Sequence, residues 1–272
     1  MRCSPRASPT PIRGDTTTEE GRSSMNRTVI VHPDAATLAA TTAARLLVRL
    51  VDAQSTHRPV HVALTGGTVG IRTLSEIAAS PVRHAVDWTG VHLWWGDERF
   101  LPDGDPDRNV TQARQALLDD LPVPEENIHP MGPSDAHDSP ESAADDYQAE
   151  LARHAESGVD DAGPALPAFD VVLLGVGPDG HVASLFPGHE ACDVLDRTVV
   201  GVHGSPKPPP HRVSLTFAAI EAADEVWLVV GGEDKAPAVA RALDPGDTDP
   251  LPAARVLGRH RTLWLVDAAA AG

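Results

Sequence analysis

The sequence predicts an α/β protein with a mostly parallel sheet and helices on both faces. Strand-like and helix-like segments alternate along nearly the whole chain, which is the pattern of a parallel sheet whose connections are helices. The strand-like runs are short, apolar and rich in β-branched residues, as expected for strands that are covered on both faces. Several of them end in glycine-rich turns, where sheets of this class bind ligands.

The predicted elements follow one another in regular order. Residues 35–54 carry alanine and leucine at helical spacing, and Ser139 followed by Pro140 supplies an N-cap and a first-turn proline for a helix that reaches about His154. Further helices are predicted directly after residues 65–68 and near 234–242. The predicted strands are 28–31, 60–64, 91–95, 169–174, 198–202, 213–217, 225–230 and 263–266.

One domain is predicted over residues 25–272, because no fixed-period repeat is visible and the Gly/Pro/Asp-rich stretch 158–167 is interpreted as a loop. Residues 1–24 are rich in Arg, Ser, Thr and Pro and have no apolar core of the kind that secretory signals carry. They are expected to be a disordered extension, or to precede a functional start at Met25. A targeting segment is the alternative.

The composition excludes several classes of protein. A net charge of −17 argues against general nucleic-acid or anionic-membrane binding, since both need basic patches. No apolar run approaches the roughly 18 residues that span a bilayer. Cys3 and Cys192 cannot build a disulfide framework or a zinc knuckle, which fits a reducing cytoplasm. An anionic metabolite can still bind where local cations and backbone N–H groups outweigh the overall charge.

The stretch 174–187 carries the strongest functional signal. It places His181 on a turn with three glycines and a proline, directly after the apolar run 169–174. Such turns lie at the carboxyl ends of the strands, where catalytic side chains are usually carried. A histidine that only packs would more often sit inside an element, so His181 is predicted to lie in an active site.

Residues Thr65, Gly66, Gly67 and Thr68 follow a buried strand and open a helix. Their backbone N–H groups can form an anion-binding nest at the helix N-terminus, which suits a phosphate. The motif lacks the lysine and glycine spacing of a Walker loop, so nucleotide binding is disfavoured. A simple tight turn is the alternative interpretation.

Asp97 and Arg99 bring a carboxylate and a guanidinium to another strand end, within the tetrapeptide 96–99. A salt-bridged surface loop is the alternative, but the Pro/Asp-rich continuation to Asn109 favours the rim of a pocket. Residues 109–111 match a glycosylation acceptor, which no secretion signal supports.

Only two of the 22 basic residues are lysines, Lys207 and Lys235, and both lie in segments with other functional signals. The proline-rich stretch 205–212 would hold Lys207 and Arg212 in a fixed relation. A polyproline ligand for a partner module is the alternative there. Lys235 follows another strand end, and its alternative is a solvated helix start.

No metal site is predicted. His181 and His189 lie eight residues apart across a proline turn, without helical zinc-ligand spacing or paired cysteines. No Gly-x-Ser-x-Gly elbow is present, so a serine nucleophile is not indicated. Chemistry by an activated water with a histidine base fits these residues better.

Taken in order, four motifs resemble the 6-phosphogluconolactonase family, part of the glucosamine-6-phosphate isomerase superfamily, over about residues 28–270. The motifs are Trp-Gly-Asp-Glu-Arg-Phe at 95–100, Leu-Gly-Val-Gly-Pro-Asp-Gly-His-Val-Ala-Ser-Leu-Phe-Pro-Gly at 174–188, Ser-Pro-Lys-Pro-Pro-Pro-His-Arg-Val-Ser-Leu at 205–215 and Pro-Ala-Ala-Arg-Val at 252–256. The resemblance implies a Rossmann-like, doubly wound fold. It also implies hydrolysis of 6-phospho-D-glucono-1,5-lactone to 6-phospho-D-gluconate, the second step of the oxidative pentose phosphate pathway, without a cofactor.

The resemblance also implies roles for individual residues. His181 would be the general base that activates water, with no covalent intermediate, and Asp179 would orient it. Backbone N–H groups of the glycine-rich turn would stabilise the oxyanion. The substrate's phosphate would bind at residues 65–68 with Arg99 and Lys207, and Asp97 would bind sugar hydroxyls. Arg212 is a further phosphate candidate, and the role of Lys235 is left open.

Two positions depart from the family pattern. The first loop usually carries proline where this chain has Gly70, which predicts a looser start to the following helix. Ala254 replaces the usual serine or acidic residue before the arginine of the last motif, which is a mild change.

Two rival functions remain at this point. One is an aldose–ketose isomerase or deaminase of the same superfamily. The stretch 205–209, which is typical of lactonases, favours hydrolysis over this alternative. The other is a non-catalytic sugar-phosphate-binding regulator, which would normally lose the histidine that this chain keeps as His181. The expected partner is a phosphorylated sugar lactone, with no nucleic acid and no membrane. A monomer and a homodimer are both compatible with the sequence.

Overall fold

The computed structural model describes residues 27–155, 165–244 and 246–272. The expected extension 1–24, with Cys3, and the start at Met25 lie outside the described residues, as does most of the stretch 158–167.

A six-stranded sheet forms the centre of the fold, in the order β1-β9-β8-β5-β2-β3. Every neighbouring pair in it is parallel, so the predicted α/β class is confirmed. Its strands are β1 (Arg27–His32), β2 (Val60–Leu64), β3 (Val91–Trp95), β5 (Phe169–Leu174), β8 (Glu225–Val230) and β9 (Arg261–Asp267).

Helices connect these strands. Ser139 caps the helix that it was predicted to open, with a reciprocal hydrogen bond to Ser142. The α-helices are α2 (Ala35–Gln54), α3 (Gly67–Ala79), α4 (Asn109–Ala116), α5 (Pro140–Arg153), α6 (Phe217–Glu221), α7 (Ala236–Leu243), α8 (Pro252–Arg255) and α9 (Ala268–Ala271). Short 3-10 helices are η1 (Pro81–Ala85), η2 (Trp88–Gly90), η3 (Leu118–Asp120), η4 (Glu125–Asn127), η5 (Glu190–Asp193) and η6 (Glu233–Lys235).

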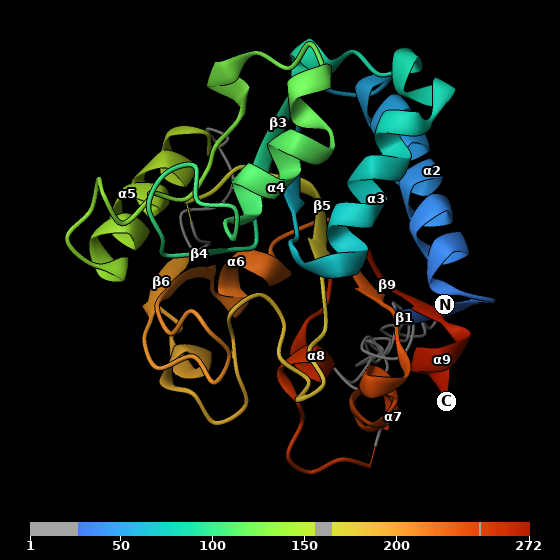
Figure 1. Ribbon diagram of the computed structural model, residues 1–272, viewed down its shortest axis with the longest axis vertical. Helices are drawn as coiled ribbons and strands as arrows, with labels where there is room; N and C mark the ends of the chain where they lie inside the picture. The colour runs from blue at the N-terminus through green and yellow to red at the C-terminus, as the bar shows by residue number, and fades with distance from the viewer. Residues whose placement is uncertain (1–26, 156–164, 245) are drawn as a thin grey trace, which may run out of the picture.

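Both faces of the sheet are covered, which makes the fold doubly wound. Except on the edge strand β1, where Val29 and Val31 are exposed, alternate side chains of the strands enter one of two cores. On β5, for example, Val171 packs with α2, α3 and α4, whereas Val172 packs with α5, α6 and α7. Figure 1 shows α2 and α3 side by side over the first of these faces. Burying each larger aliphatic side chain of these cores stabilises the fold by roughly 1.5–3 kcal/mol.

A second, three-stranded antiparallel sheet lies beside α5, in the order β4-β7-β6 (Figure 1). Its strands are β4 (Asp97–Arg99), β6 (Val199–Val202) and β7 (Arg212–Leu215). Two of them are the strands predicted near 198–202 and 213–217, which therefore pair with each other rather than extending the parallel sheet. The tetrapeptide 96–99, expected as a loop, supplies the third strand because its backbone pairs with β7.

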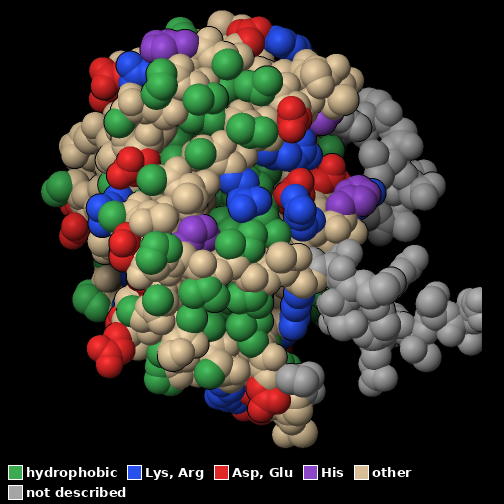
Figure 2. All heavy atoms as spheres, turned by 90° about the vertical axis from the view of Figure 1, so that its right-hand side faces the viewer, with side chains coloured by type: hydrophobic (Ala, Val, Ile, Leu, Met, Phe, Trp, Pro, Cys, Tyr) green, Lys and Arg blue, Asp and Glu red, His purple; other side chains and the backbone are tan. Residues whose placement is uncertain are grey.

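Acidic and basic side chains are interspersed with hydrophobic ones on the face shown in Figure 2, rather than forming one continuous acidic surface. Local groups can therefore determine what binds despite the net charge of −17. Among the described helices, none is both long and apolar enough to cross a bilayer.

Candidate active site

A cavity of about 360 Å³ opens at the carboxyl ends of β2, β5 and β8, next to β4. Except for Asp179, every site residue predicted from the sequence lines it, and so does Lys235. These lining residues are Thr65, Gly66, Gly67, Thr68, Asp97, Arg99, His181, Lys207, Arg212 and Lys235. Loops from distant parts of the sequence thus meet in one place, as expected for the strand ends of such a sheet.

Asp179 lies behind the histidine of this cavity. Its Oδ1 is 2.5 Å from His181 Nδ1, and Lys207 Nζ is 3.9 Å from the same oxygen. Burial opposes ionisation of Asp179, but the hydrogen bond and positive charge of His181, together with Lys207, outweigh it and lower the pKa of Asp179 to about 2. An ionised Asp179 accepts a hydrogen bond from Nδ1–H of His181, so Nε2 carries the lone pair.

The turn that holds His181 depends on two glycines. A Cβ at Gly177 would lie 2.1 Å from two atoms of the His181 ring, and Gly180 has φ +82° with Leu251 against its Cα. The Gly177 N–H donates to the His181 carbonyl (2.9 Å), which closes the turn around the imidazole. Larger residues at either position would displace the histidine.

The expectation that the glycine N–H groups of this turn stabilise an oxyanion is wrong for three of them. Gly175 N–H donates to the Thr65 hydroxyl (3.1 Å), and those of Gly177 and Gly180 donate to carbonyls within the turn. Because each already has an acceptor inside the protein, they are not available to a reacting substrate.

The loop 65–68 leads into α3, whose first turn faces the cavity. No side chain caps this helix, so its first N–H groups remain available to an anion. Gly66 lies against the side chain of Asn109, where a Cβ would come within 1.9 Å of Oδ1. Only glycine allows the two segments to approach this closely.

Gly70 does not loosen the start of α3, contrary to the expectation. A Cβ at this position would lie 2.6 Å from the Thr65 carbonyl oxygen and 2.9 Å from Thr65 Cγ2. The missing side chain lets the helix pack directly on the backbone of the preceding loop, so glycine here tightens the contact.

The four cationic side chains that line the cavity differ in the hydrogen bonds and ion pairs that they already make within the protein. Arg212 donates to the Pro209 carbonyl (3.2 Å) and the Lys207 carbonyl (3.1 Å), so it holds the proline-rich loop in place. Arg99 donates to the Asp107 carbonyl, and Lys235 forms an ion pair with Asp234. Lys207 keeps 40% of its side-chain surface exposed, and burial, partly offset by Asp179, lowers its pKa.

Asp97 is buried at the base of the cavity. The Ser184 hydroxyl donates to its Oδ2 (2.7 Å), and Arg212 Nη1 lies 3.8 Å from the same oxygen. Ser184 is thereby committed to Asp97, and within the described part of the chain it makes no hydrogen bond to His181. The arrangement offers a base with an open nitrogen but no serine nucleophile paired with it.

Sequence reasoning missed two residues that build this site. Glu98 is fully buried and accepts hydrogen bonds from the backbone N–H groups of Asn109 (2.7 Å) and Val110 (2.9 Å), which caps α4. Burial raises the pKa of Glu98 to about 7, although these N–H groups oppose the shift. Asn109 Nδ2 donates to the Asp97 carbonyl (2.8 Å), while its buried Oδ1 has no partner among the described residues. The glycosylation-like pattern 109–111 drew attention to Asn109 for the wrong reason.

The chain resembles known proteins over most of its length. Residues 33–264 match the model of the family described as glucosamine-6-phosphate isomerases/6-phosphogluconolactonase. A 6-phosphogluconolactonase of Streptomyces coelicolor is 54% identical over 245 residues, which cover 89% of this chain and 93% of that protein. A 6-phosphogluconolactonase of Mycobacterium tuberculosis is 43% identical over 249 residues, covering 91% of this chain and 98% of the other.

A solved structure of 6-phosphogluconolactonase from Trypanosoma brucei superposes with a TM-score of 0.79 at 30% identity, covering 90% of this chain and 97% of that one. The sequence match, the shared architecture and the resemblance of the four motifs agree. The chain therefore belongs to the family of glucosamine-6-phosphate isomerases and 6-phosphogluconolactonases.

Proposed function

We propose that this protein hydrolyses 6-phospho-D-glucono-1,5-lactone to 6-phospho-D-gluconate, with His181 as the general base for water. The observation that carries the proposal is the His181–Asp179 pair, whose open nitrogen belongs to a cavity lined by four cationic side chains. A sugar lactone with a phosphate at its far end matches both features. The names of relatives that are 54% and 43% identical favour this reaction over isomerisation or deamination.

In the proposed reaction, Nε2 of His181 takes a proton from water as the water oxygen adds to lactone C1. The tetrahedral intermediate then collapses, the bond between C1 and the ring oxygen breaks, and the imidazolium returns its proton to that oxygen. Asp179 keeps the proton on Nδ1 and stabilises the imidazolium, since its low pKa of about 2 keeps it ionised. Proton transfer of this kind typically contributes about 10²–10⁴-fold to a rate.

The phosphate is proposed to bind at the first turn of α3, formed by residues 67–69, with Lys207 and Arg99 as its cationic partners. The uncapped N–H groups of that turn and the exposure of Lys207 support this assignment. Arg212 has its guanidinium engaged by the loop carbonyls, so its main role is to position Lys207. Asp97, with Asn109 beside it, is proposed to bind sugar hydroxyls.

The proposal includes a cytoplasmic location, which the small number of cysteines supports.

The proposal is tested by following lactone consumption against the spontaneous rate, with the wild-type protein and with His181→Ala. The wild type is expected to accelerate hydrolysis, and the variant to lose roughly 10²–10⁴-fold while still binding 6-phosphogluconate. No acceleration by the wild type, with 6-phosphogluconate still bound, would favour the regulator. Turnover of glucosamine 6-phosphate instead would favour the isomerase or deaminase.

A further inference from the structure

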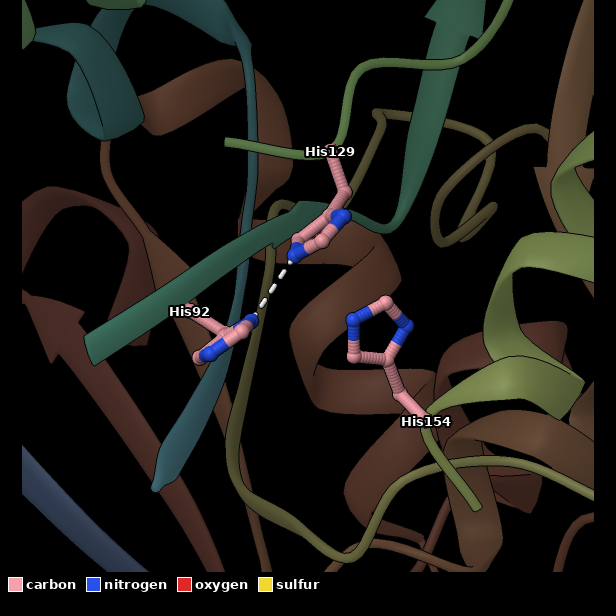
Figure 3. Close-up of side chains that lie close together, drawn as sticks. All are labelled: His92, His129 and His154. Carbon is pink, nitrogen blue, oxygen red and sulfur yellow. Dashed lines mark hydrogen bonds between the residues drawn. The ribbon is translucent and has the colours of Figure 1, made fainter. Parts of the chain in front are cut away.

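Three imidazoles from distant segments meet at the edge strand of the parallel sheet. His92 is the second residue of β3, His129 follows η4, and His154 is the C-cap of α5. One ring nitrogen from each lies within 4.8 Å of the other two. Figure 3 shows the three rings turned toward a common space. We call them the histidine cluster; it lies toward the amino end of β3, whereas the cavity lies at the carboxyl ends of the strands.

Glu150 on α5 holds the outer nitrogens of two of these rings. Its Oε1 lies 3.0 Å from His129 Nδ1, and its backbone carbonyl oxygen lies 3.1 Å from His154 Nδ1. Both acceptors place the proton on Nδ1, so Nε2 carries the lone pair in His129 and in His154. Histidines that bind metals in proteins are held in the same way, by a carboxylate or carbonyl on the other nitrogen.

His92 completes the cluster. Its Nδ1 lies 2.9 Å from His129 Nε2, along the dashed line in Figure 3. Since His129 Nε2 is an acceptor, His92 Nδ1 carries the proton in this contact. Ligation through His92 Nδ1 moves that proton to Nε2 of the same ring, which is a change of tautomer without a change of charge.

Packing keeps the central ring of the cluster ordered. The His129 ring stacks on Trp94 with centroids 3.8 Å apart and planes 10° apart.

We propose that His92 Nδ1, His129 Nε2 and His154 Nε2 bind a Zn²⁺ ion, with water as the fourth ligand. Three imidazole nitrogens suit a tetrahedral zinc ion at about 2.0–2.1 Å. A tetrahedron of that size separates its ligands by about 3.4 Å. The His92–His129 pair, at 2.9 Å, therefore has to open by tenths of an ångström, and the wider separations in the cluster, which reach up to 4.8 Å, have to close by up to about 1.4 Å. The ion ties β3, the segment after η4 and the end of α5 together, and it stabilises the fold without taking part in hydrolysis.

The sequence offered no local signal for this site. The ligands come from three separate segments, and the first two lie 37 positions apart in the sequence, instead of coming from one helix or a paired-cysteine motif. The prediction of no metal site rested only on such local spacings.

The test is zinc binding by the full chain after chelator treatment, measured by calorimetry and by X-ray absorption. The wild type is expected to bind one Zn²⁺ with imidazole nitrogens at about 2.0–2.1 Å, and zinc should raise its unfolding temperature. His154→Gln should abolish this binding. Glu150→Gln should weaken it roughly 10–100-fold, because it replaces the carboxylate that orients His129, while the backbone carbonyl of residue 150 still holds His154. Lactone hydrolysis should be the same with and without zinc.

His203→Gln is the matched control, because His203 is an exposed histidine that pairs with His211 and Glu141 outside the cluster. It should bind zinc at the same site as the wild type. The unfolding temperature of His154→Gln in chelator checks that its fold is intact. If that variant does not fold, the zinc affinity of Glu150→Gln decides the test. Failure of the wild type to bind zinc, or unchanged affinity in both cluster variants, would show that the cluster is only packed imidazole.

Discussion

His181 and His129 have the same immediate partner but opposite surroundings. Each has a carboxylate at Nδ1, Asp179 at 2.5 Å in one case and Glu150 at 3.0 Å in the other. The Nε2 of His181 belongs to a cavity lined by Arg99, Lys207 and other cations, whereas the Nε2 of His129 faces two further imidazoles.

The comparison shows that a carboxylate behind an imidazole fixes its tautomer but does not decide its function. The groups on the other side decide what the free lone pair can do. A cavity with cations admits an anionic substrate and a water molecule, so that lone pair can act as a base. Two further imidazole nitrogens beside the lone pair can supply the remaining protein ligands of a metal ion.

The largest expected effect comes from replacing Asp179, the carboxylate behind His181. The matching replacement of Glu150, the carboxylate behind His129, is the comparison. Asp179→Asn should lower kcat for lactone hydrolysis by roughly 10²–10⁴-fold, because an amide no longer favours the tautomer with Nε2 free or stabilises the imidazolium. Glu150→Gln, the matching change behind His129, should leave kcat unchanged. Initial rates corrected for spontaneous hydrolysis measure both. Equal losses in the two variants would remove the distinction drawn between the two sites.

A smaller effect is expected from the cations that are present in the cavity and missing around His129. Lys207→Met should raise KM by roughly 10- to 100-fold, the value of one charge-assisted hydrogen bond. Lys235→Met should raise it less, because Asp234 already pairs with that ammonium. Steady-state kinetics and titration with 6-phosphogluconate check the order. A larger increase in KM for Lys235→Met than for Lys207→Met would indicate that the phosphate binds nearer to η6.

The smallest effect is expected for a change in stability at the glycine-rich segment beside the cavity. His92 of the histidine cluster lies instead on a regular strand. Gly70→Ala should lower the free energy of unfolding by up to about 2 kcal/mol, because crowding against the Thr65 carbonyl costs about 1–3 kcal/mol and is only partly offset by a helix-propensity gain of about 1 kcal/mol. Urea unfolding measures the change.

Ser75→Ala on the exposed side of the same helix is the control for this substitution and should stay within about 0.5 kcal/mol of the wild type. A Gly70→Ala variant as stable as the wild type would mean that the loop 65–68 yields easily.

Much of the fold and part of the candidate site were predictable because their signals are local. Buried parallel strands are continuous apolar runs, so strands such as 169–174 could be read directly. Glycine-rich turns mark the strand ends, and these ends converge in any doubly wound sheet. Residues as far apart as Thr65, Asp97 and His181 could therefore be placed together before the structure was known.

The remainder depends on contacts between segments that no local pattern records. The acceptor of the Gly175 N–H is Thr65, which removed one of the groups expected to stabilise an oxyanion. The capping of α4 by Glu98 depends on how β4 pairs with β7. The effect of Gly70 depends on how closely α3 approaches the loop before it.

Local patterns were enough to predict the α/β class, the loops that meet at the cavity and most of the polar side chains that line it, because hydrophobic period and turn residues act over a few positions. The three-dimensional packing sets which N–H groups and carboxylates are already engaged, and it brings His92, His129 and His154 together. Hydrogen bonds and metal ligation act over about 2–3 Å, and at that range the partner is chosen by packing in space rather than by distance along the chain.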